Sequence, residues 1–517
     1  MSLTFHTTRT SFAGDPSAFA AVRDAQAARR IPAGLEPAFL ASGPAQANLD
    51  ALLSGRALAV TTGQQAGLFT GPLYTVLKAL TAVALAERLA KAWQRPVVPV
   101  FWVAGDDHDF AEIAQCDVVA QDGSRAAVRL RERGAEAPML PAYRETLGVD
   151  ATSALERLEG LLPPSEFRSG VMAWLRAAYR PERSMAEAHG QAMAALLGEQ
   201  GVVVLRGWSG GLKRAASGVV AEALRRAGEL DGLLAAEAER LLGAGRGAPV
   251  EVGNGLALVL VEGSRGRDRL RVAEGGGFVT RRSGERFDLG ALETLLRDDP
   301  ERLSANVLLR PVVEAAVVPT VAYVGGPGEL AYLPQTAPLF AVLGVPRPVS
   351  VPRLSGFVVE ARTRKTLDRF GLSVESLARP EQELAGEAAR EALPASATGA
   401  LAALRASLEA GYAALAREAG ALDRTLERPV ESARNQALGA THEIEKKLVA
   451  AAKRANETAL QQLLRARVSL YPDGHPQERV YTAASFLARY GSAFVELLLT
   501  AAREHAGSLL EARPREP

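Results

Sequence analysis

The chain has 517 residues, 48% of them hydrophobic, so it is too long for one ordinary core and too apolar to be disordered. We therefore expect two or three domains. The 60 basic and 59 acidic residues leave a formal charge of +1, which excludes a global field that recruits nucleic acid or an anionic membrane. The net charge does not exclude a local basic groove.

The sole cysteine, Cys116, excludes an intramolecular disulfide and a multi-cysteine metal site. We interpret it as a small buried hydrophobe, with a Cys-His nucleophile beside His108 as the alternative. No charge-free apolar run is long enough to span a membrane, and the N-terminus lacks the basic-then-apolar order of a signal peptide. We expect a cytoplasmic protein that binds neither nucleic acid nor membrane.

A strand-loop-helix unit comes first. Ala57 to Thr61 are apolar, as in a buried strand, and apolar residues from Pro72 onward recur at helical spacing. Glycines in the loop between them let backbone amides close on an anion at the positive end of a helix. The residues that we expect to bind an anion here are Gly63, Gln64, Gln65, Gly71, Tyr74 and Lys78.

Lys78 lies four residues after Tyr74, so both side chains share one helix face, opposite the apolar stripe. The lysine is predicted to reach an anion at the mouth of the helix. The alternative is a tight turn followed by a solvated lysine.

A second buried strand, Val97 to Ala104, ends in an acidic loop. Pro99 requires a bulge or an unpaired edge. Parallel strands joined by a helix end at the same edge, so both loops should face one crevice. The loop residues expected in that crevice are Asp106, Asp107, His108 and Asp109.

In the acidic loop, His108 suits a general base that takes the proton of an incoming ammonium, and Asp107 or Asp109 suits the carboxylate that holds its ring. Two other interpretations stay open. The carboxylates are also suited to Mg²⁺, and the cluster is compatible with a structural cap.

A third loop, Tyr323 to Glu329, follows the strand-like run Val317 to Val324. Its glycines, Gly325 and Gly326, permit a turn with positive φ, and Glu329 falls in the first turn of a helix. Tyr323 and Glu329 are predicted to hold a sugar hydroxyl or an ammonium, with a capping glutamate as the alternative.

Upstream of that loop, Asn306 and Arg310 lie on a run that ends at Pro311. Arg310 suits a bidentate grip on a carboxylate, or a buried structural pair.

The remaining pattern divides the chain. After Ala120 it turns polar and helical, short antiparallel strands are indicated between Pro249 and Phe287, and alanine-rich helices follow Pro394. We expect an α/β core made of residues 1–125, 126–230 (with a helical insertion) and 301–380, an inserted connective domain at 231–300, a coiled-coil hairpin at 381–470 and a C-terminal helical segment at 471–517.

The coiled-coil hairpin is predicted from leucines at spacings of three, four and seven, and Pro429 is placed to begin its second helix. The leucines of the first helix are Leu401, Leu404, Leu408, Leu415, Leu422 and Leu426. A basic set is interpreted as a solvated face, with a nucleotide contact as the alternative. It comprises Lys446, Lys447, Lys453, Arg454, Arg465 and Arg467.

Five blocks between residues 55 and 496 resemble the family of bacillithiol-biosynthesis cysteine ligases, also called cysteine-adding enzymes. The blocks are Gly63-Gln64-Gln65-Ala66-Gly67 with Gly71-Pro72-Leu73-Tyr74-Thr75, then Phe101 to Phe110, Asn306 to Pro311, Pro319 to Glu329 and Gln477 to Val480. Two positions depart from the family pattern: Asp106 replaces a common glutamate, and Arg206-Gly207 replaces a common acidic residue. Residues 210 to 300 match poorly, and no functional residue is carried over from them.

The resemblance implies a Rossmann-like core similar to class I nucleotidyltransferases and a C-terminal coiled coil that supports a homodimer. It also implies the joining of L-cysteine to the amine of glucosaminyl malate, the last step of bacillithiol biosynthesis. ATP or another nucleotide and Mg²⁺ are open as cofactors. The alternatives are another nucleotidyl- or amino-acid-transferring enzyme on the same core and a non-enzymatic, nucleotide-sensing coiled-coil scaffold.

Overall fold

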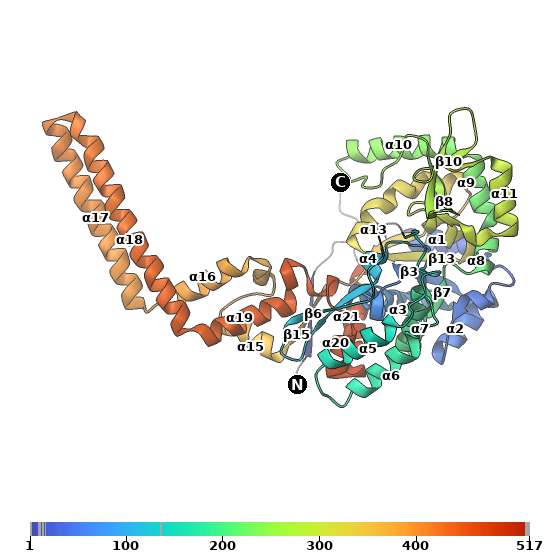
Figure 1. Cartoon of the computed structure of the whole chain (residues 1–517), viewed down its shortest axis with the longest axis horizontal. Coiled ribbons are helices and arrows are strands. Elements are labelled where there is room, and N and C mark those ends of the chain that lie inside the picture. The colour runs from blue at the N-terminus through green and yellow to red at the C-terminus, as the bar shows by residue number, and fades with distance from the viewer. Residues whose placement is uncertain (1–2, 9–11, 13–14, 16, 135–136, 512–517) are drawn as a thin grey trace. The chain divides into compact units, whose positions relative to one another are not determined.

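The computed structural model describes residues 3–8, 12, 15, 17–134 and 137–511 (Figure 1). The chain forms two compact units. The larger contains residues 5–357 and 478–517, and the smaller contains residues 1–4 and 358–477. The division falls within strands β1 (Leu3–Thr7) and β15 (Gly356–Glu360). The smaller unit therefore begins before residue 381, the expected start of the coiled-coil region.

A six-stranded sheet forms the centre of the larger unit. In spatial order its strands are β14 (Val349–Pro352), β13 (Thr320–Gly325), β3 (Leu58–Gln65), β4 (Val97–Ala104), β7 (Val203–Arg206) and β2 (Phe39–Leu40). The first five are parallel, and β2 is antiparallel to β7. The carboxyl ends of β13, β3 and β4 therefore meet at one edge, which is the arrangement expected for the three loops.

Pro99 lies in an interior strand, because β4 has β3 on one side and β7 on the other. It pairs with Val60 on β3, and the ladder to β7 begins one residue later, at Val100. At Pro99 the strand is thus unpaired on the β7 side, which accommodates a residue without an N–H group.

Helices outside the insertion complete the larger unit. They are α1 (Ala18–Gln26), α2 (Pro44–Leu53), α3 (Tyr74–Trp93), α4 (Phe110–Ile113), α5 (Asp150–Leu161), α6 (Arg168–Ala178), α7 (Met185–Leu197), α12 (Arg310–Val317), α13 (Pro327–Tyr332), α14 (Ala337–Val342), α20 (Ala484–Tyr490) and α21 (Ser492–Glu511). Helix α3 packs against β3, β4 and α21, so most of its circumference is buried. The expected C-terminal helix is divided at Gly491, which has a φ of 59°, and residues 512–517 lie outside the described part.

An antiparallel sheet with four helices is inserted after β7. Its strands, in spatial order, are β11 (Arg286–Phe287), β10 (Phe278–Thr280), β9 (Gly266–Val272), β8 (Leu256–Gly263) and β12 (Leu303–Ala305). The helices are α8 (Gly210–Ala215), α9 (Ser217–Arg225), α10 (Ala227–Gly243) and α11 (Leu289–Asp298). The antiparallel strands were expected, but this region starts before residue 231 and ends after residue 300.

A β-hairpin, β5 (Gln115–Val119) and β6 (Arg125–Arg129), occupies part of the segment that was expected to turn helical. Its turn contains Asp122 and Gly123, and Gly123 has a φ of 86°. Asp-Gly between two short strands is a hairpin signal, so the sequence did contain the information.

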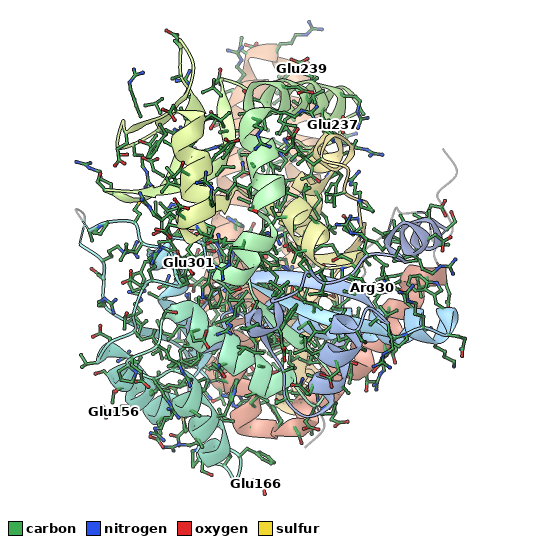
Figure 2. All side chains as sticks on the ribbon, turned by 90° about the vertical axis from the view of Figure 1, so that its right-hand side faces the viewer. Arg30, Glu156, Glu166, Glu237, Glu239 and Glu301 are labelled. Atoms are coloured by element: carbon green, nitrogen blue, oxygen red, sulfur yellow. The ribbon has the colours of Figure 1, made fainter. Side chains whose placement is uncertain are left out.

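Charged side chains on the outer helices of the larger unit face solvent. Glu156 on α5 and Glu239 on α10 are exposed, and both point away from the ribbon in Figure 2. Buried charged side chains are unusual by comparison, because lysine and glutamate are almost never fully buried unless they are paired. Lys78 and Glu314 are two such groups, at 1% and 2% exposed.

The smaller unit is helical. It consists of α15 (Ala361–Arg369), α16 (Glu381–Glu391), α17 (Ala395–Leu422), α18 (Glu427–Ala455) and α19 (Glu457–Leu470). Helices α17 and α18 pack together as the expected hairpin, and Pro429 lies in the first turn of α18. None of the helices in the described residues is long and apolar enough to cross a membrane.

The side of α17 that packs on α18 differs from the one expected. The less exposed positions of α17 are Ala397, Leu401, Arg405, Leu408, Tyr412, Ala416, Ala419 and Gly420. By contrast, Leu404, Leu415 and Leu422 are 44%, 52% and 84% exposed. Six leucines were predicted to lie on one packing face. Leu404, Leu415 and Leu422 instead form a second row that α18 does not cover.

Candidate active site

A cavity of about 530 Å³ opens at the carboxyl edge of the central sheet. Its lining contains residues from all three predicted loops and from the inserted sheet. The predicted residues that line it are Gly63, Gln64, Gln65, Tyr74, Lys78, Asp106, Asp107, Asn306, Arg310, Gly326 and Glu329. Of the other predictions, Gly71, His108, Asp109, Tyr323 and Gly325 are outside this lining.

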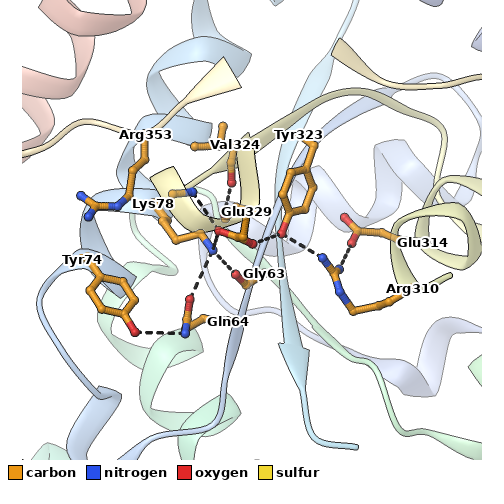
Figure 3. Close-up of polar contacts among 12 residues, drawn as sticks. Gly63, Gln64, Tyr74, Lys78, Arg310, Glu314, Tyr323, Val324, Glu329 and Arg353 are labelled. Carbon is orange, nitrogen blue, oxygen red and sulfur yellow. Dashed lines mark hydrogen bonds and ion pairs between the residues drawn. The ribbon is translucent and has the colours of Figure 1, made fainter. Parts of the chain in front are cut away.

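A buried ion pair joins the first and third loops (Figure 3). Lys78 Nζ on α3 is 2.6 Å from Glu329 Oε2 on α13. The lysine also donates to the carbonyl oxygen of Gly63 and, at 3.2 Å, to Gln64 Oε1. Burial lowers the pKa of Lys78, and the Glu329 carboxylate acts in the opposite direction.

Glu329 has further partners. Its Oε2 accepts from the N–H of Gly326 at 2.8 Å, and its Oε1 accepts from the hydroxyl of Tyr323 at 2.5 Å. Burial alone would raise the pKa of Glu329, but Lys78, Tyr323 and the Gly326 N–H together hold it below the usual value. The carboxylate thus caps its helix and neutralises Lys78 at once.

The network continues from Tyr323 to a second pair. Arg310 Nη2 donates to the Tyr323 hydroxyl at 3.0 Å, and Arg310 Nη1 is 2.6 Å from Glu314 Oε2 (Figure 3). Of the two interpretations of Arg310, the buried pair is the one formed here.

The prediction that Lys78 lies on a polar helix face is wrong, because α21 covers α3 and the lysine points inward.

The glycine-rich part of the first loop is buried under other segments. The N–H of Thr70 donates to the Tyr179 hydroxyl at 2.8 Å, and the N–H of Gly71 donates to the carbonyl of Leu68 at 2.9 Å. His189 Nδ1 lies 3.1 Å from both the nitrogen and the oxygen of Gly67. These amides therefore have protein partners, and the expected anion cradle at Gly71 is not formed.

The glycines serve chain packing instead. A Cβ atom on Gly67 would lie 2.9 Å from the Cα of Gly71, and Gly71 has a φ of 68°, where side chains other than glycine are disfavoured.

The acidic loop meets a lysine from the insertion. Lys213 Nζ on α8 is 2.8 and 2.7 Å from the two carboxylate oxygens of Asp106. Asp107 accepts from Gln65 Nε2 at 2.5 Å and from the N–H groups of His108 and Asp109. Burial would raise the pKa of Asp107, but these donors keep it below its usual value, so the carboxylate is ionised at neutral pH.

His108 lies next to the cavity and contacts the insertion. Arg267 Nη1 is 3.3 Å from His108 Nδ1, and Asp107 Oδ1 is 4.0 Å from the same atom. Because arginine has no acceptor, Nδ1 must be the acceptor and the neutral ring carries its proton on Nε2. Burial and the charge of Arg267 lower the pKa of His108, so the ring is neutral at neutral pH.

This tautomer differs from the one expected for a general base, since Nε2–H is a donor. Asp109, which was expected to hold the ring, caps α4 and accepts from the N–H of Glu112 at 3.2 Å. The loop is instead fixed through Arg133, which donates to the carbonyl of His108 at 3.2 Å and pairs with Glu145 at 2.6 Å.

Sequence reasoning missed five cations of the cavity: Lys213, Arg267, Arg269, Arg353 and Arg479. The first three lie between residues 210 and 300, where the family resemblance is weak. A local signal existed for Arg267 and Arg269, because they alternate along β9 and alternate residues share one face of a strand.

Charge in the cavity is unevenly compensated. Four lining cations have carboxylate partners, in the pairs Lys78–Glu329, Lys213–Asp106, Arg310–Glu314 and Arg353–Glu478. Arg267, Arg269 and Arg479 also line the cavity. No carboxylate of the described residues lies within ion-pair distance of these three. The cavity is therefore suited to an anionic ligand.

Cys116 is buried in β5, and burial raises the pKa of its thiol, which favours the interpretation as a small hydrophobe. Within the described ranges, no three His, Cys, Asp or Glu side chains are grouped so that they could hold a metal ion.

Comparison with known proteins identifies the family. Residues 36–354 match the model for the N-terminal Rossmann-like domain of bacillithiol biosynthesis BshC, and residues 356–509 match the model for its C-terminal coiled-coil domain. The chain belongs to the BshC family. The boundary between the two matches lies close to the division of the structural units at residue 357, whereas residues 478–509 of the second match belong to the larger unit. The predicted Rossmann-like core and C-terminal coiled coil are confirmed.

Relatives cover most of the chain. BshC from Salinibacter ruber is 32% identical over 89% of this chain and 83% of its own length. The protein from Geobacillus kaustophilus is 30% identical over 89% and 85%, and that from Symbiobacterium thermophilum is 32% identical over 91% and 86%. Each bears the name "Putative cysteine ligase BshC".

We predict that Lys78→Met destabilises the larger unit by about 3–5 kcal/mol, because it leaves the Glu329 carboxylate buried without its partner. The double variant Lys78→Met/Glu329→Gln should recover most of this loss, since neither charge remains. Urea unfolding followed by circular dichroism measures both. A single variant as stable as the wild type would contradict the buried pair.

A second prediction concerns His189, whose pKa burial lowers to about 4. Below about pH 6.5, the ordinary pKa of histidine, His189 is protonated in the unfolded chain but stays neutral in the folded chain. The free energy of unfolding therefore falls as the pH drops from about 6.5 towards 4. By pH 5 the loss from this group is about 2 kcal/mol. His189→Gln should lose less stability than the wild type between pH 7 and pH 5. Exposed His475 provides the control, because His475→Gln should keep the wild-type slope.

Proposed function

We propose that this BshC-family protein is a ligase that joins the carboxylate of L-cysteine to the amine of glucosaminyl malate, the last step of bacillithiol biosynthesis. The observation that carries the proposal is the likeness to proteins named as cysteine ligases over about nine-tenths of the chain, 89% for the Salinibacter ruber relative. The cavity supports it, because its lining offers carboxylates for an ammonium and cations for an acid group.

Forming an amide from a free carboxylate requires an activated acyl group, a neutral amine and stabilisation of negative charge on the leaving group. We propose ATP or another nucleotide as the source of activation. Mg²⁺ would then be held chiefly by phosphate oxygens, since Lys213 already engages both oxygens of Asp106. Arg479, which also lines the cavity, is a cation available to such an anion.

We propose a division of roles in the acidic loop. Asp107 is ionised and lines the cavity, so it is the acceptor for a substrate ammonium. His108, with its proton on Nε2, is a donor to negative charge that develops during acyl transfer. This assignment replaces the general base that the sequence suggested for His108.

The function is tested by incubating the full chain with glucosaminyl malate, L-cysteine and ATP, followed by mass spectrometry for bacillithiol and for AMP or ADP. We expect bacillithiol and one of the two nucleotides. Equal turnover of other amino acids would favour a different enzyme on the same core. Nucleotide binding without any product would favour a non-enzymatic sensor.

In the same assay, His108→Ala should lower turnover by about 10²-fold, the usual scale for a group that acts on a proton or a developing charge. His108→Gln keeps an N–H donor, so it should retain more activity than the alanine variant. An equal loss of turnover in both variants would favour a general base at His108 instead of a donor. Both variants should unfold at the wild-type temperature.

We also propose that the α17–α18 hairpin carries a homodimer. Leu404, Leu415 and Leu422 are separated by eleven and seven residues, which places them on one face of α17, and all three are exposed within the chain. A row of exposed leucines on a long helix is typical of an association surface, and symmetric dimers are the commonest closed assemblies.

Light scattering after gel filtration should give a dimer for the wild type at micromolar concentration and a monomer for Leu415→Glu/Leu422→Glu, because glutamate cannot be buried unpaired. Ala413→Glu is the matched control, since it adds the same charge on an exposed position of a different face. A monomeric wild type would contradict the dimer.

A further inference from the structure

One wall of the cavity is built by the inserted sheet. Arg267 and Arg269 are two residues apart on β9, so their side chains leave the same face of the strand. Strand β8 lies between β9 and β12, and its Leu260 is opposite both Arg269 and Ser304. The two arginines and the end of β12 are therefore neighbours across this sheet.

Arg267 reaches across to β12. Its Nε donates to Ser304 Oγ at 2.8 Å, and its Nη2 donates to the carbonyl oxygen of Ala305 at 3.2 Å. These bonds hold the guanidinium beside the residue that follows β12, Asn306, which also lines the cavity. The arginine is thus positioned by the protein before any ligand arrives.

Asn306 supplies a donor that the protein does not use. Its Oδ1 accepts from the N–H groups of Leu308 and Leu309 at 3.0 and 2.9 Å, which fixes the orientation of the amide. Asn306 is 7% exposed, and its Nδ2 is buried without a partner among the described residues. A buried amide donor without an acceptor is unfavourable, so a ligand oxygen at this point would remove the deficit.

The charge of this wall is also uncompensated. Arg267 is 9% exposed, and neither it nor Arg269 has a carboxylate within ion-pair distance in the part of the chain that the structure describes. The nitrogen Nε of Arg269 donates to the carbonyl of Ala257 at 3.2 Å, which leaves its two terminal nitrogens for a ligand. Two guanidinium groups and one amide together offer planar donors of the kind that bind a carboxylate.

We propose that Arg267, Arg269 and Asn306 form a subsite for a carboxylate group of the acceptor substrate. The proposal rests on the proposed function and deepens it, since the malyl part of glucosaminyl malate carries such groups. Leu260, Leu296 and Leu303 also line the cavity, so a singly charged carboxylate loses less hydration there than a phosphate dianion. Arg310, the residue first expected to grip a carboxylate, is already paired with Glu314.

The test measures binding of L-malate to the full chain by isothermal titration calorimetry. Arg269→Gln should weaken binding by at least about tenfold, because it removes one charge–charge contact. Arg271→Gln is the matched control: it lies on the same strand, is exposed, donates to the carbonyl of Asn254, and is not among the cavity-lining residues. It should bind L-malate as the wild type does.

Asn306→Asp gives an independent variant of nearly identical shape. One aspartate oxygen can still accept from Leu308 and Leu309, while the buried donor becomes a negatively charged acceptor. We expect wild-type thermal stability within a few degrees and loss of L-malate binding. Unchanged L-malate affinity in both Arg269→Gln and Asn306→Asp would overturn the subsite.

Further measurements distinguish a carboxylate ligand from a phosphate ligand, and the subsite from the proposed function. If the variants lose affinity for ATP or inorganic phosphate but keep it for L-malate, the wall binds phosphate and the carboxylate assignment is wrong. If the wild type makes no bacillithiol yet the variants lose L-malate, the proposed function fails and the subsite stands. If the wild type makes bacillithiol and the variants keep its KM for glucosaminyl malate, the subsite fails and the function stands.

Discussion

The ion pair between Lys78 and Glu329 is the constraint on which the cavity depends. Two charges taken out of water are stable only when their geometry is good and their other donors and acceptors are satisfied. Lys78 therefore needs Gly63 and Gln64, and Glu329 needs Tyr323 and the N–H of Gly326. These bonds tie the end of β3 to the end of β13 and so define one side of the cavity.

Once these pairs have formed, few cations of the α/β core remain available to bind a ligand. The cations of α3 and α12 are engaged by glutamates, and Lys213 is engaged by Asp106. Among the described residues that line the cavity, the cations without a carboxylate partner are Arg267 and Arg269 on β9 and Arg479. The Rossmann-like sheet thus provides a rigid frame, and the segments added to it provide most of the electrostatic attraction for an anion.

The sequence predicted the parallel strands well, because strands buried on both faces read as uninterrupted apolar runs, as in Val97 to Ala104. It also predicted that three loops converge. It could not give the partner of Lys78, which lies 251 residues later, so the lysine was expected to reach an anion at the mouth of the helix rather than a buried glutamate. The row of leucines on α17 was ambiguous for a related reason: spacing reveals an apolar face, but only packing shows which face meets α18.

Arg267 shows how one residue outside the recognisable motifs can organise a site. It is held by Ser304 and Ala305 on β12, it contacts Nδ1 of His108, and it lines the cavity. A cation at Nδ1 requires the ring to carry its proton on Nε2, whichever carboxylate lies nearby. The chemistry available to the His-Asp motif is therefore set by the inserted sheet as well as by the motif, because a base and a donor differ only in which ring nitrogen is protonated.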